Sequence, residues 1–174
     1  MNTANKLTML RVALIPVFLI LLYLRFPFHM YFALTVFIQA SVTDFVDGYI
    51  ARHYNQVTNF GKFMDPLADK VLVMAAMCYL VEIGQMPGWC LAIVLLREFA
   101  VSGMRLVAVE QGRVIAAAWS GKVKTASTMV CLCLMLVFES NLLNVVCIAV
   151  IVATTVYSGI EYFAKNLDVF KEAD

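Results

Sequence analysis

The stretch SVTDFVDGYIARHYNQVTNFGKFMDPLADK, residues Ser41–Lys70, places four aspartates in a chain that is otherwise strongly apolar. The 174 residues are 63% hydrophobic and 14% charged, with a mean hydropathy of +0.85. A soluble domain is typically about half apolar and about a quarter charged. The composition therefore indicates an integral membrane protein, in which intramembrane carboxylates indicate a functional site.

Apolar segments long enough to cross a bilayer recur along the whole chain. As helices of about 20 residues, they match a hydrocarbon core about 30 Å thick. The segments are Leu7–Leu24, Tyr31–Arg52, Lys62–Ile83, Gly88–Val109, Ser120–Phe138 and Leu142–Phe163. They predict an all-α, polytopic membrane protein of six transmembrane helices in one domain, residues 1–174, with any active site built from the helices themselves.

The basic residues predict the orientation of these helices. Lys and Arg favour the cytoplasmic side of a membrane. Nine of them lie at the amino end, in the second and fourth loops and in the tail: Lys6, Arg11, Arg52, Lys62, Arg113, Lys122, Lys124, Lys165 and Lys171. Both termini are therefore expected to face the cytoplasm. The net charge of +1, without a basic stripe interleaved with aromatic residues, argues against a nucleic acid partner.

The four aspartates fall on two helical stripes. Residues three or four apart share one face of a helix. Asp44 lies about 12 Å, and Asp69 about 10 Å, from the ends of their helices that share a membrane face, at 1.5 Å per residue. The stripes can therefore meet at matching depth on the cytoplasmic side, in a cavity within the membrane. Their members are Asp44, Asp47, Gly48 and Ala51 in the second segment and Gly61, Asp65 and Asp69 in the third.

Four carboxylates in one crevice need positive charge among them. Two of them about 5 Å apart repel by roughly 3 kcal/mol at an effective dielectric constant of 20. Arg52 and Lys70 can each offset one charge, but an all-carboxylate set is the ligand preference of Mg²⁺, Mn²⁺ or Ca²⁺. Two ions would neutralise the set and suit displacement at phosphorus. Gly48 and Ala51 leave room either for a planar group or for helix packing.

The whole pattern, Asp44-x2-Asp47-Gly48-x2-Ala51-Arg52-x8-Gly61-x3-Asp65-x3-Asp69, is similar to the signature of the CDP-alcohol phosphotransferases. The resemblance implies six transmembrane helices in a homodimer and two divalent cations, Mg²⁺ or Mn²⁺. It implies roles for single residues as well. Asp44, Asp47, Asp65 and Asp69 would bind the metals, Gly48 and Ala51 would admit the cytidine, Arg52 would bind the pyrophosphate, Gly61 would contact the same donor, and Asp69 would be the catalytic base.

Three further stretches resemble one branch of that family, the bacterial phosphatidylglycerophosphate synthases. They are NKLTMLRVALIP near the amino end, LREFAVSGMRL in the fourth segment and WSGKVKT at the start of the fifth. This resemblance implies transfer of a phosphatidyl group from CDP-diacylglycerol to sn-glycerol 3-phosphate, with release of CMP. It implies the cytoplasmic membrane of a bacterium, with the active site facing the cytoplasm. Whether Asn5 and Thr8 contact the nucleotide stays open.

Four cations are candidates for binding a phosphate on the acceptor. A charged side chain such as that of Arg97 costs free energy in the middle of a membrane helix, which favours a functional role. Arg105, Lys122 and Lys124 lie nearer the cytoplasmic face, where they could bind a phosphate. Glycerol 3-phosphate calls for such a cationic pocket, whereas serine does not. The alternative for Lys122 and Lys124 is the general preference of Lys for the cytoplasmic side. Arg97 can instead pair with Glu98 or neutralise the acidic stripes.

Other functions fit parts of the sequence. The same chemistry can use another acceptor: inositol phosphate, serine or phosphatidylglycerol. An acidic intramembrane site also suits a divalent-cation transporter, but the outer halves of the second and third segments, MYFALTVFIQ and VLVMAAMCYLV, are almost wholly apolar. The carboxylates of a structural membrane subunit would merely pair with Arg52, Lys62 and Lys70. The sequence favours the transferase.

Overall fold

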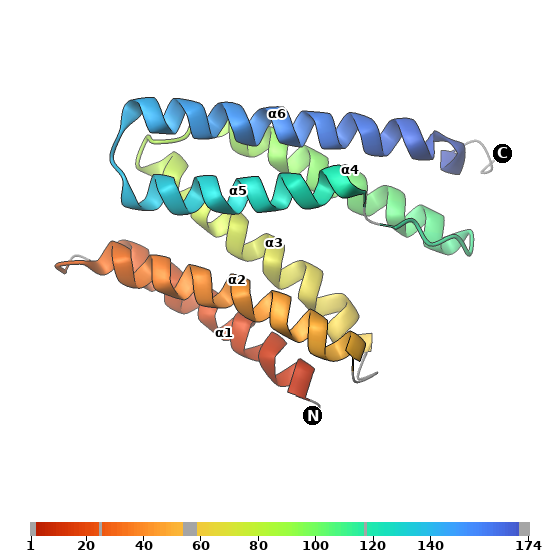
Figure 1. Ribbon diagram of the computed structural model, residues 1–174, viewed down its shortest axis with the longest axis horizontal. Coiled ribbons are helices and arrows are strands. Elements are labelled where there is room, and N and C mark those ends of the chain that lie inside the picture. Colours follow the sequence, from red (N-terminus) through yellow and green to blue (C-terminus); the bar gives the residue numbers. More distant parts are fainter. Residues whose placement is uncertain (1–2, 25, 54–58, 117, 171–174) are drawn as a thin grey trace. The chain divides into compact units, whose positions relative to one another are not determined.

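The computed structural model is all-helical over the part of the chain that it describes. It describes the backbone of residues 3–24, 26–53, 59–116 and 118–170, and the side chains of residues 8–24, 26–43, 64, 67–116 and 118–169. No strand occurs in these segments (Figure 1). The elements are α1 (Thr3–Tyr23), α2 (His29–His53), α3 (Asn59–Glu82), α4 (Gly88–Glu110), α5 (Trp119–Val137), α6 (Asn141–Asn166) and the short 3₁₀ helix η1 (Leu167–Phe170).

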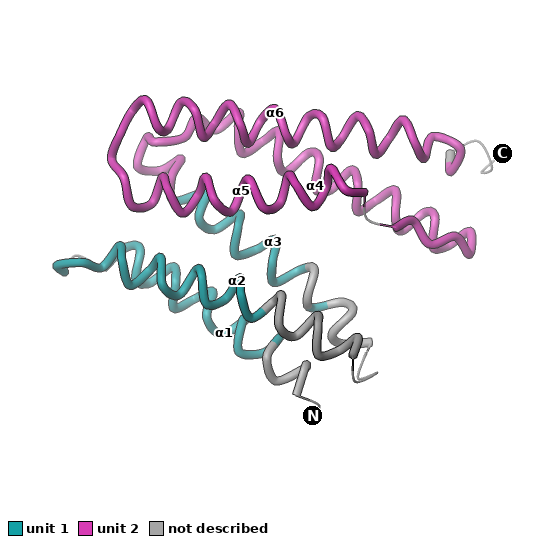
Figure 2. The backbone as a smooth tube through the Cα atoms, viewed as in Figure 1, with its two compact units in different colours: residues 1–79 teal, residues 80–174 magenta. Residues whose placement is uncertain are grey.

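The prediction of six long helices is confirmed. The largest difference from the predicted segments is at the first helix, which begins at Thr3 rather than Leu7. Polar residues at the helix ends explain the difference, because hydropathy identifies the apolar part of a helix and not its full hydrogen-bonded length. The helices group into two compact units, Met1–Tyr79 and Leu80–Asp174 (Figure 2).

In the first unit, α1 and α2 form an antiparallel pair joined by a short connection (Figure 1). Each helix buries one face at the seam, where the rings of Phe18 and Phe37 lie 5.5 Å apart between centroids. The carboxyl end of α1 also touches α3, because the ring of Tyr23 meets that of Tyr79 edge-on at 5.6 Å. Aromatic pairs of this geometry stabilise packing beyond the area that they bury.

In the second unit, α6 packs against both α4 and α5. Its buried residues recur every three or four positions, as expected for a helix that presents one face to its neighbours. This face is unusually polar for a membrane protein, since it includes a serine, a threonine and an asparagine. The buried residues of α6 are Asn144, Cys147, Ile151, Thr155, Ser158 and Tyr162.

Two glycines end helices in this chain. Gly84 and Gly112 have φ angles of 76° and 73°, in the left-handed region that side chains disfavour. After α4, the N–H groups of Gly112 and Arg113 donate to the carbonyls of Val109 and Ala108. Such bonds satisfy the last carbonyls of the helix. A glycine in this conformation therefore lies just after the end of α3 and just after the end of α4.

Length and hydropathy identify two helical stretches of the described residues that could cross a membrane, Trp119–Val137 and Asn141–Val169. Thr8–Tyr23 is a shorter apolar helix. The 23 residues of α4 include four charged ones, which lowers their hydropathy. The apolar helices bear out the prediction of a membrane protein, while six crossings stay a prediction.

Candidate active site

The first acidic stripe continues the buried face of α2. Helix α2 carries Asp44 and Asp47 in its second half. In its first half, Ala33, Phe37 and Ala40 are buried, with exposed fractions of 0 to 1%. At 100° per residue, positions 33, 37, 40, 44, 47 and 51 fall within an arc of about 80°. The positions of the acidic stripe therefore continue the helical phase of the buried residues of α2, while Ile38 and Val42, about half a turn away, are exposed.

In α3, Asp69 also lies on the side of the helix that carries buried residues. Asp69 is half-buried, and the buried residues Leu72 and Ala76 lie one and two turns further along the same face. The exposed residues Leu67 and Val71 lie on the opposite face. Position 65 is one turn before Asp69 on the acidic side. The candidate base therefore points away from the apolar outer surface of α3.

Several predicted site residues lie outside the side chains that the structure describes. The mutual distances of the carboxylates therefore stay a prediction. Within the described side chains, no group of three or more His, Cys, Asp or Glu residues forms a metal site, and Asp69 is the predicted metal ligand among them. The remaining predicted residues, whose helical backbone alone is described, are Asp44, Asp47, Gly48, Ala51, Arg52, Gly61 and Asp65.

A buried arginine lies next to the acidic stripe of α2. Arg11 of α1 has an exposed fraction of 0%, and its Nε donates to the carbonyl oxygen of Ala40 at 3.3 Å. Ala40 is one turn before Asp44 on the same face of α2. The sequence analysis counted Arg11 only as a basic residue near the cytoplasmic end. Its position on the buried stripe of Thr8, Ile15 and Phe18 was the signal that could have revealed its burial.

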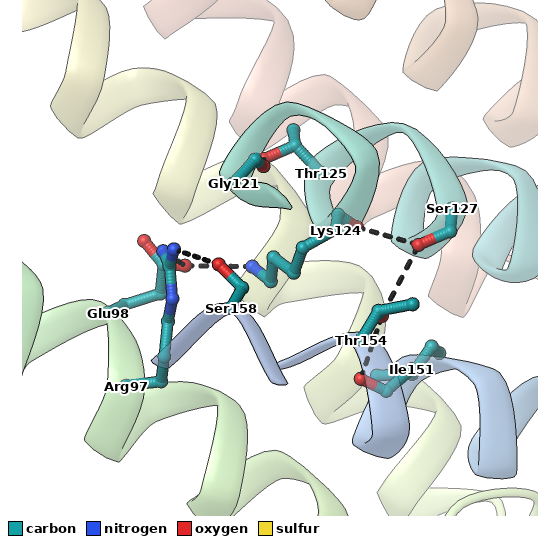
Figure 3. A network of polar contacts seen from close by, with 9 residues as sticks. All are labelled: Arg97, Glu98, Gly121, Lys124, Thr125, Ser127, Ile151, Thr154 and Ser158. Carbon is teal, nitrogen blue, oxygen red and sulfur yellow. Dashed lines mark hydrogen bonds and ion pairs between the residues drawn. The ribbon is translucent and has the colours of Figure 1, made fainter. Parts of the chain in front are cut away.

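The second unit holds a partly buried cluster of charged side chains, which we call the cation pair because it centres on Arg97 and Lys124. The Oε1 atom of Glu98 accepts hydrogen bonds from Nη1 of Arg97 at 2.9 Å and from Nζ of Lys124 at 2.8 Å (Figure 3). The three side chains have exposed fractions of 13%, 13% and 5% for Arg97, Glu98 and Lys124. Charge-assisted bonds of this length are among the stronger polar contacts in proteins.

Helix α6 holds the arginine of the cation pair from the other side. The Nη2 atom of Arg97 donates to Oγ of Ser158 at 2.6 Å. Of the two alternatives that the sequence left for Arg97, pairing with Glu98 is thus the one that the described contacts support. Figure 3 shows the side chains of α4, α5 and α6 converging on this point.

The two other predicted phosphate-binding cations have different surroundings. Arg105 is exposed, donates from Nε to the hydroxyl of Tyr162 at 3.0 Å, and lies 5.5 Å above the ring of that tyrosine. Lys122 is also exposed, and its Nζ lies 5.6 Å from the ring of Trp119. Both are therefore available at the surface of the second unit, whereas Lys124 is buried.

Two cations of the second unit share one carboxylate among the described contacts. Glu98 accepts from both Arg97 and Lys124, which lie on α4 and α5. Buried charge is costly unless it is paired. Arginine and lysine side chains held in this way are of the kind that binds phosphate groups in proteins.

Comparison with known proteins identifies the family. The sequence profile described as CDP-alcohol phosphatidyltransferase matches residues 1–157. The chain belongs to the CDP-alcohol phosphatidyltransferase family. The match extends across both units and includes the acidic stripes of α2 and α3 and the cation pair. The family resemblance inferred from the signature is thereby confirmed, as is the prediction that this chain is a phosphatidyltransferase enzyme.

Three relatives of this phosphatidyltransferase bear the same name or a synonym of it. A Bacillus subtilis (strain 168) protein named CDP-diacylglycerol--glycerol-3-phosphate 3-phosphatidyltransferase is 42% identical over 192 aligned residues, covering 99% of both chains. A protein of the same name from Escherichia coli (strain K12) is 41% identical over 137 residues, covering 75% of this chain and 74% of its own. A Mycobacterium tuberculosis (strain ATCC 25618 / H37Rv) protein named probable phosphatidylglycerophosphate synthase is 38% identical over 172 residues, covering 95% and 82%.

Proposed function

We propose that this chain transfers the phosphatidyl group of CDP-diacylglycerol to sn-glycerol 3-phosphate, giving phosphatidylglycerophosphate and CMP. The observation that carries the proposal is the family match over residues 1–157, which includes the signature on α2 and α3 with Asp69 half-buried. Relatives that cover nearly the whole chain bear names that state this reaction. The cation pair of the second unit supplies the positive charge that a phosphorylated acceptor requires.

Asp69 is the proposed general base. Its carboxylate accepts the proton of the acceptor's primary hydroxyl as that oxygen attacks the phosphorus that bears diacylglycerol. The new P–O bond forms while the bond from that phosphorus to the CMP oxygen breaks, and CMP leaves with the electron pair. Gly48, Ala51, Arg52 and Gly61 are the proposed contacts of the donor. No covalent enzyme intermediate is required.

The residues present fit a pair of divalent cations. The family resemblance implies such ions, and the proposed ligands are Asp44, Asp47, Asp65 and Asp69, all carboxylates carried by two consecutive helices. Carboxylate oxygens are the ligands preferred by Mg²⁺ and Mn²⁺. When bound there, such ions would polarise the pyrophosphate and stabilise the charge of the departing CMP.

The acceptor's phosphate is proposed to bind the cations of the second unit. Arg97 and Lys124 are the buried members of this set, and Arg105 and Lys122 are the exposed ones. A phosphate monoester offers acceptor oxygens to several such donors at once. An acceptor without a phosphate, such as serine, would leave the buried cations without the anion that they require.

We further propose that the chain is a single domain of six membrane crossings. The helices have 19 to 26 residues, or about 28 to 39 Å at 1.5 Å per residue, and so reach across a core about 30 Å thick. An even number of crossings puts both termini on one side, which the basic residues assign to the cytoplasm of a bacterium. The active site then faces the cytoplasm. A homodimer is the assembly that the family resemblance suggests.

A transfer assay tests the proposed function. The purified chain is mixed with CDP-diacylglycerol and radiolabelled glycerol 3-phosphate, inositol phosphate or serine, with Mg²⁺, with Mn²⁺ or with EDTA. We expect labelled lipid and CMP in equal amounts with glycerol 3-phosphate and a divalent ion, and none with EDTA. Faster transfer to inositol phosphate or serine would refute the proposed acceptor, and undiminished transfer in EDTA would refute the proposed metal ions.

A further inference from the structure

Glu98 joins two cations from two helices through one oxygen atom. Its Oε1 accepts from Nη1 of Arg97, the preceding residue of α4, and from Nζ of Lys124 on α5. Two positive groups within hydrogen-bond distance of the same oxygen would otherwise repel each other strongly in a buried place. The carboxylate therefore fixes the separation of the two cations.

The arginine is also held by α5 and α6. Ser158 of α6 accepts its Nη2 at 2.6 Å. Glycines leave the space that the side chain occupies: a Cβ at Gly121 of α5 would lie 3.4 Å from Nη2, and a Cβ at Gly159 of α6 would lie 3.4 Å from Cγ. The guanidinium is thus confined on several sides. Preorganised donors of this kind are typical of binding sites for charged groups.

One donor in this confined place has no partner among the described residues. The Nε atom of Arg97 is buried and makes no hydrogen bond within them. A buried donor without an acceptor is costly, and here it belongs to a cation that already shares its carboxylate partner with Lys124. Both observations favour an anion with several acceptor oxygens as a further partner of this arginine.

We propose that Glu98 is a positioning residue for the acceptor. It does not bind the acceptor, and instead holds Arg97 and Lys124 at the separation at which they bind the phosphate monoester of glycerol 3-phosphate. The inference rests on the proposed function, because it takes these two cations as the acceptor's phosphate site. It assigns a task to a carboxylate that is distinct from the acidic stripes of α2 and α3.

Substitution Glu98→Gln tests this role by steady-state kinetics with the full chain in mixed micelles of CDP-diacylglycerol. We expect the KM for glycerol 3-phosphate to rise at least about 10-fold, as expected for loss of oriented charged hydrogen bonds, while kcat and the KM for CDP-diacylglycerol change by less than about threefold. Glu110→Gln, the same change at an exposed position of the same helix, serves as the control. A lower kcat with an unchanged KM for glycerol 3-phosphate would show a merely structural role and overturn the proposal.

Two further variants keep the test sharp. Glu98→Asp retains the charge but is one methylene shorter, so it should hold only one of the two cations. Its KM for glycerol 3-phosphate should lie between those of the wild-type chain and Glu98→Gln. In a Lys124→Met background, Glu98→Gln should raise the KM by a smaller factor than in the wild-type chain, because the part of its effect that passes through the lysine is already lost. Independent, multiplying effects of the two substitutions would refute that relation. If Glu98→Gln does not fold, Ser158→Ala releases the same arginine, and an unchanged KM in that variant overturns the proposal.

A binding measurement separates this inference from the proposed function. Inorganic phosphate should raise the thermal unfolding midpoint of the wild-type chain in detergent, and should raise that of Glu98→Gln much less. Equal shifts would overturn the positioning role even if transfer to glycerol 3-phosphate is confirmed. Conversely, a wild-type chain that fails to use glycerol 3-phosphate but shows the difference in phosphate response would refute the proposed function and leave a preorganised anion site.

Discussion

The two units of this phosphatidyltransferase carry charges of opposite sign. In the first unit, α2 and α3 carry the aspartates of the family signature, of which Asp69 is half-buried. In the second unit, α4 and α5 hold the partly buried Arg97 and the buried Lys124 around Glu98. The difference separates two chemical tasks: carboxylates suit metal binding and proton transfer, while buried cations suit a phosphate group.

The two units also differ in how far apart in the sequence their charged residues lie. The acidic stripes come from two helices that are consecutive in the chain, and each stripe follows the helical period. The cation pair is assembled from three helices, with 26 positions between Glu98 and Lys124 and 61 between Arg97 and Ser158. If the division of tasks is correct, substitutions in the first unit should lower kcat and those in the second should raise the KM for the acceptor.

The largest effect is expected for Asp69→Asn. An amide cannot accept the proton of the attacking hydroxyl, so release of CMP should fall by about 10²–10⁴-fold, the usual contribution of a general base. The measurement is CMP release at saturating CDP-diacylglycerol and glycerol 3-phosphate. Asp168→Asn, the same exchange at an exposed position after α6, should stay near the wild-type rate. Retention of more than about a tenth of the activity by Asp69→Asn would rule out its role as the base.

A smaller and different effect is expected for Lys124→Met. Loss of one charged hydrogen bond to the acceptor's phosphate should raise the KM for glycerol 3-phosphate roughly 10- to 100-fold, since such bonds contribute about 1.5–3 kcal/mol. The KM for CDP-diacylglycerol should change little. Lys165→Met, at an exposed position of α6, is the matched control. A Lys124→Met variant with reduced kcat and normal KM for the acceptor would remove the proposed distinction between the units.

Arg11→Met should affect stability in the first unit. The Arg11 side chain is fully buried and donates to the carbonyl oxygen of Ala40. Loss of this charged hydrogen bond should lower the free energy of unfolding by about 2 kcal/mol and the unfolding midpoint by roughly 4–8 °C. Differential scanning fluorimetry in detergent measures the change, and Arg11→Lys should recover part of it. An unchanged midpoint would show that the packing of α1 against α2 does not depend on this cation.

The sequence predicted what depends on one helix at a time. The positions of the six described helices followed from hydropathy, with ends that differ by up to four residues, and the stripe through Asp44 and Asp47 stays a prediction from the helical period. The same period distinguishes Lys122 from Lys124, which lie about 200° apart around α5; the first is exposed and the second is buried. Depth in the membrane alone does not distinguish the two lysines, so both were equal candidates for the phosphate.

Contacts between helices were beyond such reasoning. Arg97 shares the buried spacing of Val94, Val101 and Met104 on α4, so its burial was readable in principle. Its partner on α6, Ser158, was not, because no period relates a serine on one helix to an arginine 61 positions earlier. The role of Glu98 depends likewise on the register of α4 against α5. Register results from the packing of all the side chains at the seam and not from any short motif.

The smallest effect is expected for Arg113→Met, which tests whether burial is what gives the charges of the second unit their importance. Arg113 pairs with Asp168 near the ends of α4 and α6, but the two side chains are 42% and 51% exposed. Water screens such a pair and already solvates both groups, so its contribution to stability is small. The unfolding midpoint and the KM for glycerol 3-phosphate should both stay within the error of measurement, in contrast to Lys124→Met, whose lysine is 5% exposed.

An increase in the acceptor KM as large as that of Lys124→Met would mean that positive charge anywhere on this unit attracts the acceptor. Such a result would indicate general electrostatic attraction rather than a defined phosphate site. The KM difference between the wild-type chain and each variant should then disappear in 0.5 M salt.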